Sequence, residues 1–77
     1  MEDIETMAMK IVHAYEDLFF DQGKRAPFDS ILRRYLGLVD PDGEMDLYEA
    51  AVALGRNHGR EFQEMVQALR EKGLLPD

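Results

Sequence analysis

The sequence predicts an all-α protein, either a compact four-helix bundle or an orthogonal array of four helices. Apolar residues recur at steps of three and four along most of the chain, which is the spacing of one face of an α-helix. No segment alternates apolar and polar residues over the length of a strand. Glycine and proline divide the helical stretches by short connections, as in small helical domains.

The length and composition limit what this protein can be. Its 77 residues are expected to form a single domain over residues 1–77. There is no cysteine, which excludes disulfides and thiolate metal sites and fits a cytoplasmic setting. The net charge of −7 disfavours nucleic acid as a partner and favours a basic protein. No apolar run reaches the roughly 20 residues that cross a membrane.

The first two helices are expected over residues 3–20 and 29–36. The apolar stripe of the first helix comprises Ile4, Met7, Ala8, Ile11, Tyr15 and Leu18. Gly23 should stop this helix, and residues 24–27 read as a loop because they end in proline. Asp29 would then cap the second helix, and Gly37 would close it.

The third and fourth helices are expected over residues 46–57 and 60–72. Asp46 and Glu49 have the spacing of a capping box at the start of the third helix. Gly73 should end the fourth helix, after which Leu74 and Leu75 are expected to fold back onto the core. The apolar stripe of the fourth helix comprises Phe62, Met65, Val66 and Leu69.

The first helix carries more apolar residues than one stripe needs. With successive side chains about 100° apart around a helix, Met9 and Phe20 point away from the face centred on Ile4. Either another part of the chain covers these residues, or they form a docking surface. The expected partner-binding residues are Met9, Val12, Phe20, Leu74 and Leu75. The partner would be another protein with a basic patch or a second copy of the chain, and a homodimer is the favoured case.

An acidic stretch in the middle of the chain offers an alternative function. With Gly43 at position 6, residues 38–49 resemble the calcium loop of the EF-hand family, except that Leu38 stands where the first ligand belongs. The metal site that this resemblance implies comprises Asp40, Asp42, Glu44, Asp46 and Glu49. The other reading is a Pro-Asp-Gly turn followed by a capped helix, which needs no metal. We expect that no cofactor is bound.

Two further resemblances cover parts of the chain. The Ala-Ala and Leu-Gly pairs in residues 49–55, followed by residues 62–75, resemble a DNA-binding helix-turn-helix. The acidic side chains Glu61, Glu64 and Glu71 on the would-be reading helix disfavour contact with phosphates. The triplet at residues 29–31, Asp-Ser-Ile, resembles the site at which carrier proteins attach a phosphopantetheine arm, which would place the arm on Ser30.

No catalytic residue is predicted, and we expect that the protein is not an enzyme. The two histidines, His13 and His58, stand far apart in unrelated contexts, and neither has a nucleophile at a recognisable spacing. A single domain of this size also has little room for a substrate pocket of about 300 Å³.

Overall fold

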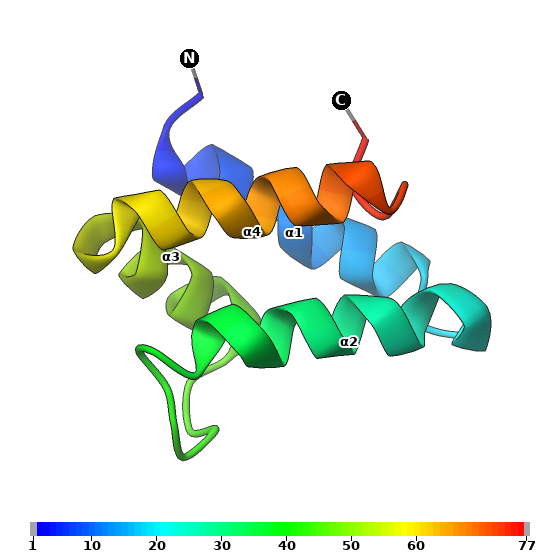
Figure 1. The fold of residues 1–77 in the computed structure, drawn as a ribbon, viewed down its shortest axis with the longest axis horizontal. Coiled ribbons are helices and arrows are strands. Elements are labelled where there is room, and N and C mark those ends of the chain that lie inside the picture. Colours follow the sequence, from blue (N-terminus) through cyan, green and yellow to red (C-terminus); the bar gives the residue numbers. More distant parts are fainter. Residues whose placement is uncertain (1, 77) are drawn as a thin grey trace.

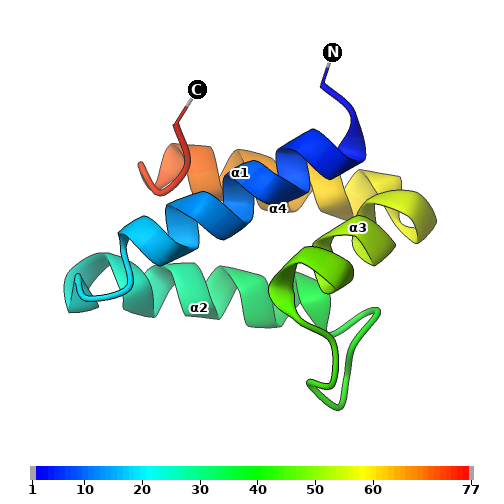
Figure 2. The same ribbon diagram turned by 180° about the vertical axis from the view of Figure 1, so that it is seen from behind.

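The computed structural model, which describes residues 2–76, confirms an all-α fold of four helices. They are α1 (Ile4–Asp17), α2 (Gln22–Leu36), α3 (Leu47–Asn57) and α4 (Gly59–Glu71), as Figure 1 shows. The molecule measures 31 × 30 × 17 Å. Its short dimension corresponds to two helices of about 10 Å diameter stacked on each other. Figure 1 shows α4 in front of α1, and Figure 2, from behind, shows the reverse order.

The helices pack in an open array in which α3 connects the other three. The main packing contacts join α1 to α3, α3 to α4 and α2 to α4. In both views the two ends of the chain lie on one side of the molecule, and the connection between α2 and α3 lies on the opposite side (Figures 1 and 2). The outward side of α1 is therefore next to the C-terminal segment (residues 74–76) and far from the acidic stretch.

The predicted stripes form the core. Those of α1 and α4 contribute Met7, Ala8, Ile11, Phe62, Met65, Val66 and Leu69 to the buried cluster. Two further core residues, Ala51 and Leu54 of α3, have no exposed surface, and neither does Phe28 of α2. Burial of these side chains is the main source of stability, at about 1.5–3 kcal/mol for each large one.

The predicted ends of the last two helices are largely confirmed. Asp46 caps α3, because its carboxylate accepts a hydrogen bond from the backbone N–H of Glu49 at 2.8 Å. Gly73 follows the end of α4 with a φ of +70°, a conformation that favours glycine. The backbone N–H of Leu74 then donates to the carbonyl of Leu69 at 2.9 Å, which turns the C-terminal segment back toward the core.

The predicted boundary between the first two helices is wrong. α1 ends at Asp17 instead of residue 20, and α2 begins at Gln22 instead of residue 29. Asp21 caps α2 by accepting a hydrogen bond from the backbone N–H of Lys24 at 3.3 Å. Pro27 lies inside α2, in its second turn, where it cannot donate to the Gly23 carbonyl and its ring crowds that carbonyl. The cap at Asp21 and the contacts of Arg25 with Phe19 and Asp29 support this first part of the helix.

The predicted cap residue Asp29 has a different role. It lies in the middle of α2, where its carboxylate accepts a hydrogen bond from the Tyr15 hydroxyl of α1 at 2.7 Å. This hydrogen bond raises the pKa of Tyr15, because the bond and the negative charge of Asp29 both favour the protonated phenol. The interaction ties α1 to α2 at a point where the chain between them reverses direction.

An ion pair between α1 and α3 gives the stability a predictable pH dependence. Arg56 Nη2 donates to Glu5 Oε1 at 2.5 Å, and this bond lowers the pKa of Glu5 below its usual 4.5. A lowered folded-state pKa means that the stabilisation is present above pH 4.5 and is lost as the pH falls through the folded-state value. We therefore expect Arg56→Gln to lower the thermal midpoint at pH 7, and this loss to shrink progressively as the pH falls below 4.5, as measured by circular dichroism. A loss that stays the same as the pH falls would contradict this role for the pair.

Candidate docking surface

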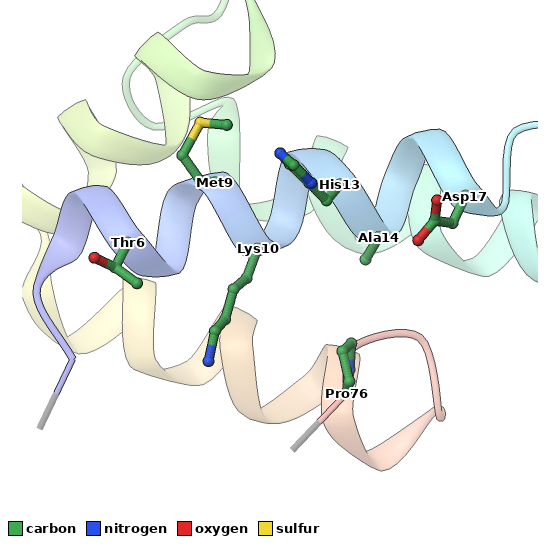
Figure 3. A pocket seen from close by; sticks show the side chains of 7 residues that line it. All are labelled: Thr6, Met9, Lys10, His13, Ala14, Asp17 and Pro76. Atoms are coloured by element: carbon green, nitrogen blue, oxygen red, sulfur yellow. The ribbon is translucent and has the colours of Figure 1, made fainter.

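An open groove runs along the outward side of α1 (Figure 3). Its larger part has a volume of about 460 Å³ and is lined by Thr6, Met9, Lys10, His13, Ala14, Asp17 and Pro76. In Figure 3, Pro76 of the C-terminal segment lies across from Ala14 of α1. The groove is thus formed by one helix and by the chain end that Gly73 turns back beside it.

A smaller hollow of about 250 Å³ continues this groove toward the end of α1. It shares Ala14, Asp17 and Pro76 with the larger part and reaches Leu18. We call the two hollows together the α1 groove. Leu74 and Leu75 line the smaller hollow, but they are only 3% and 4% exposed. These leucines therefore shape the groove from below, and we leave them out of the surface that a partner would contact.

Beyond Asp17, two aromatic side chains project from the turn that joins α1 to α2. Phe20 is 92% exposed and Phe19 is 41% exposed. Their rings meet edge to face, with centroids 5.0 Å apart and an interplanar angle of 88°. Together with Arg25, these residues form what we call the aromatic corner. A phenylalanine that keeps nearly all its surface in water contributes no burial energy to this chain.

Arg25 holds the aromatic corner in place. Its guanidinium lies 4.2 Å from the centroid of the Phe19 ring, within the range of a cation–π interaction. The same group donates to the Phe19 carbonyl at 3.4 Å and lies 3.5 Å from an oxygen of Asp29. These contacts hold Phe19 against α2. The next residue, Phe20, touches the Phe19 ring and is otherwise exposed to solvent.

Acidic side chains surround the aromatic corner. Glu16 and Asp17 lie in the last turn of α1, which carries no basic residue, and Asp21 follows Phe20 directly. The C-terminal end of a helix carries partial negative charge, so acidic residues there are unfavourable for the helix itself. None of the ion pairs found within residues 2–76 involves these three carboxylates. Among the residues that the structure describes, Glu16 and Asp17 therefore place negative charge without a basic partner at the end of α1, whereas Asp21 caps the start of α2.

The sequence identified part of this surface. Met9 and Phe20 are exposed as expected, at 42% and 92%. Val12 is half-buried and does not line the groove. The sequence analysis did not predict that Asp17, Phe19 and Arg25 belong to this surface. Phe19 and Arg25 are six residues apart, which is not a spacing at which side chains of one helix meet. Whether any of these residues binds a partner remains a prediction.

In the acidic stretch, the side chain of Asp40 binds backbone N–H groups of the same loop. One oxygen of the Asp40 carboxylate accepts a hydrogen bond from the N–H of Glu44 at 2.8 Å, and the other accepts one from the N–H of Met45 at 3.0 Å. Gly43 has a φ of +67°, as a turn at this position requires. A hydrogen bond between the carboxyls of Asp46 and Glu49 raises the pKa of Glu49, as does the negative charge of Asp46. No group of three metal-ligating side chains occurs within residues 2–76. The geometry therefore gives the calcium alternative no support.

This arrangement predicts how the stretch responds to mutation and to calcium. Asp40→Ala should lower the free energy of unfolding by about 0.5–1.5 kcal/mol, because two loop N–H groups lose their acceptor to water. Millimolar calcium should leave the thermal midpoint of both proteins unchanged, as measured by circular dichroism. A calcium-dependent rise in the wild-type midpoint that is absent from Asp40→Ala would instead support a metal site.

The other two resemblances also gain no support from the geometry. A single residue, His58, separates α3 from α4, whereas a helix-turn-helix has a turn of about three or four residues. Ser30 is exposed but lies in the middle of α2, not at the start of a helix.

Among residues 2–76, no helix has the length and apolar character needed to cross a membrane. Comparison of the chain with protein-family models, with curated proteins and with solved structures finds no match.

Proposed function

We propose that this protein is an interaction module that binds another protein through the α1 groove and the aromatic corner. The observation that carries this proposal is the 92% exposure of Phe20, two residues beyond Leu18, where the lining of an open groove ends. Single exposed apolar residues are ordinary on protein surfaces. Phe20 differs because its ring meets that of Phe19, which Arg25 contacts, and because the groove extends to Leu18, two residues before it.

The energy available from this surface is sufficient for recognition. Complete burial of one phenylalanine contributes about 1.5–3 kcal/mol, which corresponds to roughly a 10- to 150-fold gain in affinity. Protein interfaces typically depend on a few such anchors, and aromatic residues are frequent among them. Met9 in the groove would add a second apolar contact.

The test compares Phe20→Ser and Met9→Ser with Leu38→Ser, a control that removes a 52% exposed leucine from the connection between α2 and α3. We expect Phe20→Ser to abolish capture of the partner from cells of the organism that encodes the protein, and Met9→Ser to weaken it. The control should leave capture unchanged. Since these side chains are exposed, each substitution should alter the free energy of unfolding by less than about 0.5 kcal/mol.

Measurement of molar mass in solution completes this test. A mass that rises with concentration and falls to the monomer value in Phe20→Ser would identify a second copy as a partner. A strictly monomeric chain whose partner capture is insensitive to Phe20→Ser and Met9→Ser would overturn the proposal.

A further inference from the structure

The charges around the aromatic corner indicate what occupies the α1 groove. We infer that it binds a basic amphipathic helix of a different protein, an inference that rests on the docking function proposed above. The apolar side chains of this helix enter the groove and contact Phe20. Its lysine or arginine side chains approach the carboxylates of Glu16 and Asp17 at the end of α1.

The acidic residues make this end of the groove a site for cations. Glu16 and Asp17 lie where the last carbonyl groups of α1 already carry partial negative charge. Their position is unfavourable for the isolated helix, and a bound cation would relieve the repulsion. A residue that weakens its own helix without a compensating contact is typical of a binding surface.

Two basic side chains near the groove, Lys10 and Arg25, are already engaged within the chain, and the exposed Lys24 forms no ion pair with Glu16 or Asp17 within residues 2–76. Lys10, which lines the groove, forms an ion pair with Glu2 at 2.6 Å. Arg25 lies against the Phe19 ring and beside Asp29. These cations compensate other groups, so the negative charge at the end of α1 remains available to a partner.

The same charges disfavour a second copy as the occupant, although the sequence alone favoured a homodimer. Each chain carries a net charge of −7, so two copies repel each other. A two-fold dimer also places the same surface of both copies together. Glu16 and Asp17 of both copies would then lie in one interface, and like charges brought into one interface reduce affinity.

The dimensions of the groove fit one helix of the partner. Its α1 lining extends from Thr6 to Leu18, which at 1.5 Å per residue is a length of about 18 Å. A helix of about three turns covers this distance. An amphipathic helix that places its apolar face in a groove is a common mode of recognition.

The test uses a lysine–leucine peptide of about 14 residues with leucine at helical spacing, and measures its dissociation constant by calorimetry. A glutamate–leucine peptide of the same pattern is the control for charge, and a lysine–serine peptide is the control for apolar contact. We expect the lysine–leucine peptide to bind and neither control to do so. Phe20→Ser should weaken its binding about tenfold or more, the loss that corresponds to one apolar anchor.

Paired charge variants separate a site from general attraction to an acidic protein. The double variant Glu16→Gln, Asp17→Asn should weaken binding about fivefold. The control Asp42→Asn, Glu44→Gln removes the same two charges from the connection between α2 and α3 and should change binding less than about twofold. Because Glu16 and Asp17 oppose the helix dipole, their double variant should have an unchanged or higher thermal midpoint, which excludes loss of folding as the cause.

The outcomes distinguish this inference from the proposed function. Equal effects of the two charge pairs, or no binding of the lysine–leucine peptide, would overturn the basic helix as the occupant. If partner capture or self-association still depends on Phe20 in that case, the docking function stands with a different occupant. If neither depends on Phe20, both proposals fail.

Discussion

Phe28→Ala is expected to lower the free energy of unfolding by about 3–5 kcal/mol, the largest effect of any single substitution considered in this protein. Phe28 has no exposed surface, and its ring packs edge to face against Tyr15 with centroids 5.3 Å apart. Removing the ring leaves a cavity at the junction of α1 and α2. For a chain of this size, a total stability of about 4–12 kcal/mol is typical, so this single substitution should remove a large share of it.

The matched control for this variant is Phe20→Ala, which removes the same ring from the exposed position nearby. Its free energy of unfolding should differ from the wild type by less than about 0.5 kcal/mol. Urea titrations followed by circular dichroism at 222 nm, the usual helical signal, would measure both values. Similar losses in the two variants would mean that Phe20 is covered in the free protein, and the docking surface would then lose its main residue.

Gly55→Ala is expected to destabilise the protein by about 1–3 kcal/mol, although alanine normally favours a helix over glycine by about 1 kcal/mol. Gly55 is buried in α3 where α1 crosses it. A Cβ atom at this position would lie 2.6 Å from Cγ2 of Ile4, closer than van der Waals contact allows. α1 would have to move away from α3, and this displacement would outweigh the gain in helix propensity.

Two comparisons test that explanation by urea titration. Gly59→Ala adds a methyl group at the start of α4 where nothing lies within 4 Å, so it should be neutral or slightly stabilising. In an Ile4→Ala background, the atoms that the new methyl group meets are absent, so Gly55→Ala should cost about 1 kcal/mol less than in the wild type. An undiminished cost in that background would show that the close approach of Ile4 is not the cause.

The fold was largely predictable because most local signals agree with the packing. The apolar stripe of α4 depends on residues three or four positions apart, and the cap at Asp46 depends on Glu49, three positions later. Both patterns can be recognised in the sequence alone. The start of α2 was not predictable in this way. Gly23 and Pro27 indicate a loop, but the structure has a helix at both positions. Contacts with the preceding turn, above all the contact of Arg25 with Phe19, help to stabilise this helix. Such contacts depend on the fold and leave no trace in helical periodicity.

The candidate surface was predictable only as far as it depends on one helix. The angular position of Met9 indicates its exposure, and the structure confirms it. Phe20 is also exposed, but for a different reason than predicted. α1 ends at Asp17, so Phe20 lies in the turn that follows and not on the outward face of the helix. The groove itself requires Pro76 to lie beside α1, a relation between the two ends of the chain that no sequence pattern specifies.

The central claim is that Phe20 is exposed in the free protein and is covered by a partner, and one measurement tests it directly. The chain contains no tryptophan, so Phe20→Trp introduces a single fluorescent reporter at this position. We expect the free variant to emit at the wavelength of tryptophan in water, and its emission to shift to shorter wavelength when the lysine–leucine peptide or a captured partner is added. Emission that is already shifted in the dilute protein, or that stays unshifted with saturating partner, would contradict the claim.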